Sequence, residues 1–109
     1  MESKQIDELL EKQRRFYQSG ATIPVDFRIQ QLKKLYAAVK KYENDIQKAL
    51  FTDLGKSGFE SFMCEVGLAQ SEISYMIRLT RQLSRKRTVA TPLAQFASHS
   101  YIQPVPHGN

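Results

Sequence analysis

The chain has 109 residues, 41% of them hydrophobic and 25% charged, and its formal net charge at pH 7 is +5. This length allows at most one small domain, and the composition is typical of a globular protein and not of a disordered one. The apolar runs are too short to span a membrane, the acidic N-terminus does not suit a signal peptide and one cysteine cannot form an internal disulfide, so we expect a cytoplasmic protein.

Two amphipathic helices are predicted in the first part of the chain. The first is expected from about Ser3, a suitable N-cap, to Ser19, and Gly20 is expected to end it. Pro24 suits the first turn of the second helix. Apolar residues then recur at helical spacing between residues 27 and 39, which predicts a broad buried stripe.

Two further helices are predicted from capping patterns. Asn44 and Gln47 resemble a capping box, and the helix that they open is expected to end at Gly55. Ser57 and Glu60 form a second box, which opens the longest helix, expected to reach about Arg85. The buried stripe of the third helix is expected to consist of Ile46, Ala49, Leu50 and Leu54.

The pattern changes at Thr88. Proline and small residues predict an extended connector, and residues 98–109 begin a strand and a turn. No other stretch has the pattern of a strand, so we expect this strand to have no partner within the chain and the sequence to stop inside a domain. The predicted fold class is mainly α: a bundle or hairpin of amphipathic helices with a C-terminal extended strand.

The basic residues are unevenly distributed. All 11 acidic residues precede residue 73, and a nucleic-acid-binding protein could use the basic cluster that follows. Cations are also favoured at helix C-termini, and no interleaved aromatic residues or known binding motif accompany them. We favour the helix-end explanation for the cluster, which consists of Arg78, Arg81, Arg85, Lys86 and Arg87.

The residue patterns that resemble chemistry have structural explanations. Gly55-Lys56-Ser57 resembles the end of a phosphate-binding loop, but Leu50 replaces the required first glycine and a helix precedes the motif. Cys64 has no base nearby in the sequence, so packing is the better interpretation. His99 and His107 have no third metal ligand at suitable spacing. We therefore predict no catalytic, cofactor-binding or metal-binding residue in the chain.

Several segments, in their order and spacing, resemble the N-terminal portion of class 3-type NAD(P)-dependent aldehyde dehydrogenases. The resemblance extends from about Leu9 to Asn109. The segments are Phe27-Arg28-Ile29-Gln30-Gln31-Leu32, Asp53-Leu54-Gly55-Lys56-Ser57, Glu65-Val66, Glu72-Ile73, Thr91-Pro92 and Tyr101-Ile102-Gln103-Pro104-Val105-Pro106-His107-Gly108.

The resemblance implies an α/β parent enzyme that oxidises aldehydes to carboxylic acids with NAD or NADP through a cysteine thioester. Residues 1–87 would be the N-terminal helical part of the cofactor-binding domain, and residues 88–109 a connector and the start of a subunit-bridging arm. The family's catalytic and dinucleotide-binding positions lie beyond the matched segments, so the chain itself would be inactive and bind no cofactor. The resemblance also places Cys64 and Leu68 near the mouth of the substrate tunnel, where their apolar character would favour apolar aldehydes.

The expected partner is the rest of the same enzyme or a second copy of the chain, in a homo-oligomer. Two other classes of protein stay open. One is a stand-alone helical interaction module that associates with itself; the other, less favoured, is a basic nucleic-acid-binding protein. We expect no nucleic-acid or membrane contact from this segment.

Overall fold

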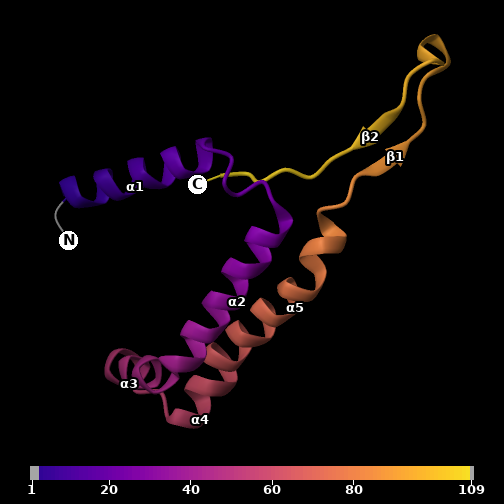
Figure 1. The fold of residues 1–109 in the computed structure, drawn as a ribbon. Helices are drawn as coiled ribbons and strands as arrows, with labels where there is room; N and C mark the ends of the chain where they lie inside the picture. The colour runs from indigo at the N-terminus through magenta and orange to yellow at the C-terminus, as the bar shows by residue number, and fades with distance from the viewer. Residues whose placement is uncertain (1–2, 109) are drawn as a thin grey trace. The chain divides into compact units, whose positions relative to one another are not determined.

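The computed structural model describes residues 3–108, and they are mainly α-helical, as predicted (Figure 1). The chain divides into two compact units: a terminal unit of residues 1–28 and 81–109, and a central unit of residues 29–80. The elements in chain order are α1 (Ser3–Gln18), α2 (Val25–Lys41), α3 (Glu43–Leu54), α4 (Gly58–Ser61), the π-helical segment η1 (Phe62–Val66), α5 (Gly67–Leu83), β1 (Arg87–Val89), the 3-10 turn η2 (Leu93–Gln95) and β2 (Ser100–Ile102).

Glycines end α1 and α3, as the sequence predicts. Gly20 has a φ of 77° and donates its N–H to the Tyr17 carbonyl oxygen at 3.0 Å. Gly55 has a φ of 65° and donates to the Phe51 carbonyl oxygen at 2.9 Å. A residue without a Cβ adopts this left-handed conformation without steric cost, which is why glycine suits both positions.

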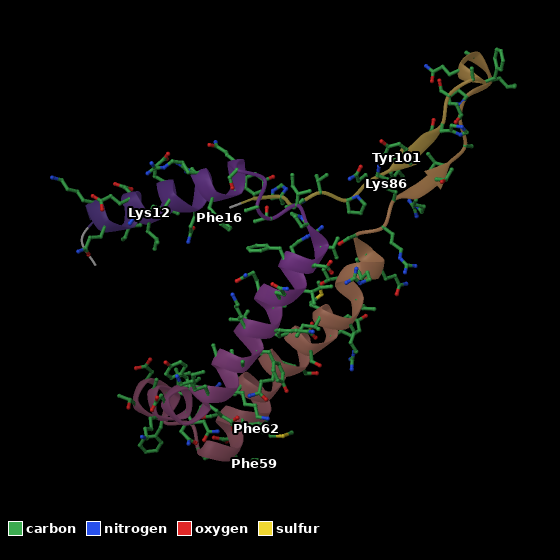
Figure 2. The ribbon with its side chains drawn as sticks, in the orientation of Figure 1. Lys12, Phe16, Phe59, Phe62, Lys86 and Tyr101 are labelled. Carbon is green, nitrogen blue, oxygen red and sulfur yellow. The ribbon has the colours of Figure 1, made fainter. Side chains whose placement is uncertain are left out.

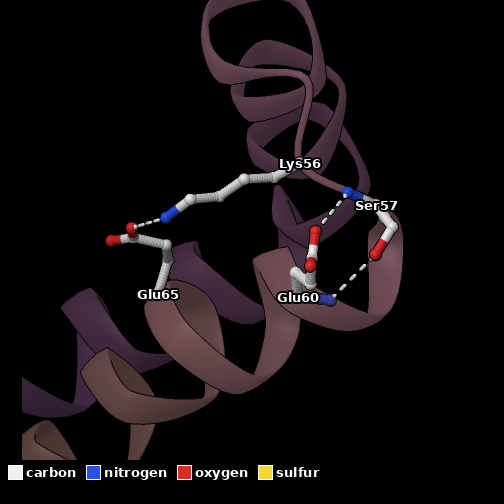
Figure 3. Close-up of polar contacts among 4 residues, drawn as sticks. All are labelled: Lys56, Ser57, Glu60 and Glu65. Carbon is white, nitrogen blue, oxygen red and sulfur yellow. Dashed lines mark hydrogen bonds and ion pairs between the residues drawn. The ribbon is translucent and has the colours of Figure 1, made fainter.

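Only one of the two predicted capping boxes forms. The Ser57 hydroxyl accepts from the Glu60 N–H, and the Glu60 carboxylate accepts from the Ser57 N–H, both at 3.2 Å (Figure 3). The box predicted for Asn44 and Gln47 is wrong, because α3 begins two residues earlier than an Asn44 cap requires. Tyr42 occupies the N-cap position without a side-chain cap, and the Gln47 amide donates to the Glu43 carboxylate at 3.3 Å.

The central unit has a very small core. Ser61 and Val66 are almost fully buried, and Val66 is the only buried hydrophobic residue among residues 3–108. The predicted buried stripe of α3 is only partly correct, since Leu54 is 63% exposed and Ala49 is exposed, while Ile46 and Leu50 are half-buried. The helices of this unit therefore keep apolar faces uncovered.

The terminal unit contains a β-hairpin that the sequence did not predict. β1 pairs antiparallel with β2, in the register Thr88 opposite Tyr101, and η2 lies at the tip between them (Figure 1). The expectation of a strand without a partner is wrong. Three residues are too few to show the alternation of apolar and polar residues that identifies a strand. β1 also lies where we expected the longest helix to end and the connector to begin. α5 ends at Leu83, two residues before the predicted end.

Candidate functional site

A π-helical turn interrupts the longest predicted helix. In η1 the Gly67 N–H donates to the Phe62 carbonyl oxygen, five residues earlier. A Cβ on Gly67 would lie 2.8 Å from that same oxygen, so this turn accepts only glycine without shifting. Single π-turns inside α-helices are frequent at functional sites because they change which side chains face a neighbour. The only sequence signal was a glycine inside a helical pattern.

The π-turn borders a groove of about 520 Å³ in the central unit. Tyr36 of α2 lines it together with residues of η1 and α5, so these helices lie side by side, as Figure 1 also shows. Phe62, Met63 and Leu68 contribute exposed apolar surface, with Met63 57% and Leu68 58% exposed. Polar residues line the groove as well, among them Gln70, Ser71 and Arg78, so its wall is mixed and the apolar face expected near Leu68 stays a prediction.

Lys56 and Glu65 form an ion pair beside this turn. The Nζ of Lys56 lies 2.5 Å from a carboxylate oxygen of Glu65 (Figure 3). This hydrogen bond is the main cause that raises the pKa of Lys56 above its ordinary value of 10.5. Lys56 thus contacts Glu65 and Ser57 caps a helix, and both side chains of the former phosphate-loop candidate have structural partners.

Within the central unit, residues 29–80, Cys64 has no histidine that could act as its base. Its side chain is exposed, so the expectation that it packs in a core is wrong for this chain. His99 and His107 belong to the terminal unit, whereas Cys64 belongs to the central unit. Within residues 3–108, no three His, Cys, Asp or Glu side chains are grouped as metal ligands.

The predicted basic cluster is divided among several environments. Arg81, in the last turn of α5, pairs with Asp26 at 2.5 Å. Lys86 lies over the ring of Tyr101, 4.5 Å from its centroid (Figure 2). Because α5 ends at Leu83, only part of the cluster lies at the helix end, and the helix-end explanation holds for Arg81.

None of the described helices combines the length and the apolar character that crossing a membrane requires.

Comparisons with known proteins identify the relatives of the chain, although no family model matches it. The 4,4'-diaponeurosporen-aldehyde dehydrogenase of Staphylococcus aureus is 39% identical over 85% of this chain and 20% of its own length. The dimeric NADP-preferring aldehyde dehydrogenase of Canis lupus familiaris is 36% identical over 94% of the chain and 23% of its own length. Aldehyde dehydrogenase family 3 member A2 of Rattus norvegicus is 31% identical over 94% of the chain and 21% of its own length.

A solved structure agrees with the sequence relatives. The substrate-bound state of Staphylococcus aureus AldH superposes with a TM-score of 0.84 at 36% identity, over 90% of this chain and 21% of that protein. The chain spans about a fifth of the length of the relatives that it matches. Over most of its residues, the chain is therefore a homologue of aldehyde dehydrogenases, family 3 members among them.

Proposed function

We propose that the chain is the N-terminal helical portion of an enzyme that oxidises aldehydes to carboxylic acids with NAD or NADP. The observation that carries this proposal is the similarity to aldehyde dehydrogenases in both sequence and fold, at 36% identity and a TM-score of 0.84 over 90% of the chain. In this reaction a cysteine thiolate adds to the aldehyde carbonyl, hydride leaves to the dinucleotide, and water hydrolyses the resulting thioester.

The role proposed for the chain itself is structural. Residues 1–87 would form the helical part of the cofactor-binding domain, and residues 88–109 a connector and the start of the arm that joins subunits. Two observations support this role for Gly55-Lys56-Ser57, the segment that most resembles a phosphate-binding loop: it follows a helix, and its Lys56 is paired with Glu65. We therefore assign no cofactor contact and no catalytic role to this chain.

The substrate class proposed for the whole enzyme is an apolar aldehyde. The face formed by η1 and the start of α5 exposes the apolar side chains of Met63 and Leu68, and Cys64, next to Met63 in the sequence, is exposed as well. The Staphylococcus aureus relative carries 4,4'-diaponeurosporen-aldehyde in its name. Apolar side chains at a substrate entrance favour apolar substrates, because both surfaces leave water on binding.

The proposed partner is the remainder of the same enzyme or a second copy of the chain, and the proposed compartment is the cytoplasm. The exposed apolar faces of the central unit support a partner of this kind, since such faces are more stable when covered.

An antibody raised against the chain tests this function. We expect it to detect a protein several-fold heavier than the chain in the source cells. The captured protein should reduce NAD or NADP when an apolar aldehyde is added, and should act more slowly on a short polar aldehyde.

The pure 109-residue chain is the control for that assay, and we expect no turnover from it. A native protein of the chain's own mass, or a captured heavier protein that oxidises no aldehyde, would contradict the proposed function. Turnover by the pure chain would contradict the structural role.

A further inference from the structure

Part of the basic cluster lies outside the helix-end explanation. Arg81, in the last turn of α5, pairs with Asp26. Three further cations follow the helix and have no role in the proposed function: Arg85, Lys86 and Arg87. All three residues are exposed, and within residues 3–108 none of them forms an ion pair. Their positive charge is therefore accessible to a ligand at one place in the terminal unit.

The three cations line a groove of about 410 Å³, where the chain passes from α5 to the hairpin. This volume lies within the range of small-molecule sites, about 300 to 1,000 Å³. No acidic residue is among the described residues that line the groove, so no side chain of its wall neutralises the cations. The rest of the lining comes from the end of α5, from β2 and from the segment after β2: Gln82, Leu83, Ile102 and Pro104.

The hairpin places one of the guanidinium groups beside apolar surface. Arg87 lies directly opposite Ile102 in the register of β1 and β2, so the two side chains lie on the same face of the hairpin. Ile102 is 50% exposed, and Leu83 at the end of α5 is 54% exposed. A ligand in the groove can therefore contact a charged group and apolar side chains at the same time.

Lys86 is held to the hairpin by an aromatic contact. Its Nζ lies 4.5 Å from the centroid of the Tyr101 ring, and Figure 2 labels both residues. Tyr101 and Ile102 are neighbours on β2, so their side chains point to opposite faces of the hairpin. Lys86 therefore adds positive charge near the groove, while the guanidinium groups of Arg85 and Arg87 are the donors for a bound anion.

The chemistry of these donors favours phosphate over carboxylate. A guanidinium presents a planar set of N–H donors that matches two oxygens of one phosphate, and two guanidinium groups suit two linked phosphates. A single carboxylate would leave most of the positive charge of the groove uncompensated. The ligand should therefore carry several negative charges close together.

The extent of the cluster favours a small ligand over a nucleic acid. Residues 88–109 contain no lysine or arginine, so no cation in that segment could follow a longer phosphate backbone. On the other side of the groove, Arg81 already has Asp26 as its partner. The positive charge is thus concentrated over three residues in sequence, Arg85 to Arg87.

We propose that this groove binds an organic polyphosphate, a small molecule with two or three linked phosphate groups at one end of an apolar body. Arg85 and Arg87 donate to phosphate oxygens, and Lys86 adds attraction through its charge. The body lies against Ile102 and Pro104. The proposal does not rest on the aldehyde oxidation proposed above.

The test is a titration of the ¹⁵N-labelled 109-residue chain with ATP at about 0.15 M salt, followed by the amide signals in NMR spectra. We expect saturable shifts at Arg85, Arg87, Ile102 and Gln103. AMP has the same body with one phosphate and should bind at least about tenfold more weakly, because a charge-assisted contact is lost. NAD, whose two phosphates are internal, should bind as weakly as AMP. Tripolyphosphate lacks the body and should bind several-fold more weakly than ATP.

Variants separate the proposed contacts from the general positive charge of the chain. Arg85→Gln and Arg87→Gln should each weaken ATP binding about tenfold. Arg14→Gln removes the same charge from α1, outside the lining, and is the matched control, which should bind ATP as the parent chain does. Ile102→Thr should weaken binding of ATP but not of tripolyphosphate, because it reduces only the apolar wall.

Four results would overturn the proposal. They are equal affinity for ATP and AMP, tighter binding of NAD than of ATP, an equal loss of ATP affinity in Arg14→Gln and in the two arginine variants of the groove, or tighter binding of a single-stranded oligothymidylate than of ATP. The last result would mean that the cluster binds the backbone of a nucleic acid.

Discussion

At the scale of single residues, Gly67 controls the conformation of the longest helix. Its φ of −65° is ordinary for a helix, so backbone freedom is not the reason for glycine here. The reason is space, because a Cβ would lie 2.8 Å from the Phe62 carbonyl oxygen and 3.3 Å from the Phe62 ring. The first of these neighbours is backbone and cannot move without changing the turn.

The first prediction concerns Gly67→Ala. Alanine is normally the better helix former by about 1 kcal/mol, yet here we expect the free energy of unfolding to fall by about 1–3 kcal/mol, because the added methyl group overpacks the π-turn. Gly58→Ala is the matched control, since its Cβ meets only the flexible Gln47 side chain, at 3.3 Å. Urea unfolding followed by circular dichroism measures both. Equal stability of the two variants would contradict the steric argument.

The second prediction concerns the charge on Lys56. The hydrogen bond to Glu65 raises the Lys56 pKa in the folded chain, so the ion pair stabilises the fold fully below the ordinary value of 10.5. This stabilisation disappears as the pH rises through the folded-state pKa. Glu65→Gln should lower the Lys56 pKa toward 10.5, which NMR titration of the lysine side chain measures.

Asp45→Asn is the control for the Lys56 titration, because Asp45 pairs with Lys48 and not with Lys56. It should leave the Lys56 pKa unchanged. If Glu65→Gln also leaves the Lys56 pKa unchanged, Glu65 is not the group that raises this pKa.

At the scale of elements, the start of the α4–α5 helical run depends on its capping box. The third prediction is that Ser57→Ala lowers the free energy of unfolding by about 1 kcal/mol, because the Glu60 N–H loses its acceptor. Asn44→Ala should cost much less, since α3 begins at Glu43 and has no side-chain cap. Urea unfolding of the two variants checks this difference. Equal losses would mean that Asn44 caps α3 in solution, as its sequence pattern suggests.

The sequence identifies elements where local chemistry determines them. Gly20, Gly55 and the pair Ser57 and Glu60 act within one turn of the chain, and all were predictable. The hairpin was not, because a strand as short as Arg87–Val89 is defined by its partner and not by its own pattern. The π-turn adds one residue to a helical turn, and the only indication of it in the sequence is that Gly67 is a glycine inside a helical pattern.

Contacts between residues far apart in the sequence are encoded by no local pattern. The bond from Tyr17 to Pro106 joins residues 89 positions apart, and the central groove brings Tyr36 beside Met63 and Leu68. The sequence did not predict the central groove, and the expectation of an apolar face near Leu68 came from the family resemblance.

At the scale of the whole molecule, the chain has more apolar surface than it can bury. Among residues 3–108, Val66 is the single buried hydrophobic residue, whereas many large apolar side chains are more than a third exposed. In the central unit Phe59 is 75% exposed and Phe51 64%. Proteins of this length rarely leave such faces in water, since each Å² of apolar surface that is covered contributes about 25 cal/mol.

The fourth prediction is that the isolated chain associates with itself in a concentration-dependent way. Sedimentation equilibrium over a wide concentration range should show a dimer or larger species that dissociates on dilution. The double variant Phe51→Gln and Phe59→Gln should weaken the association about tenfold or more, because it removes two exposed rings from the central unit (Phe59 is labelled in Figure 2). Phe96→Gln is the control: Phe96 is 86% exposed but follows η2 in the terminal unit, so its loss should leave the association constant unchanged.

Equal effects of the double variant and the control would mean that the chain associates through non-specific hydrophobic contacts. A chain that stays monomeric at the highest concentration would show that its exposed faces do not bind one another, and the remainder of the proposed enzyme would then be the partner that covers them.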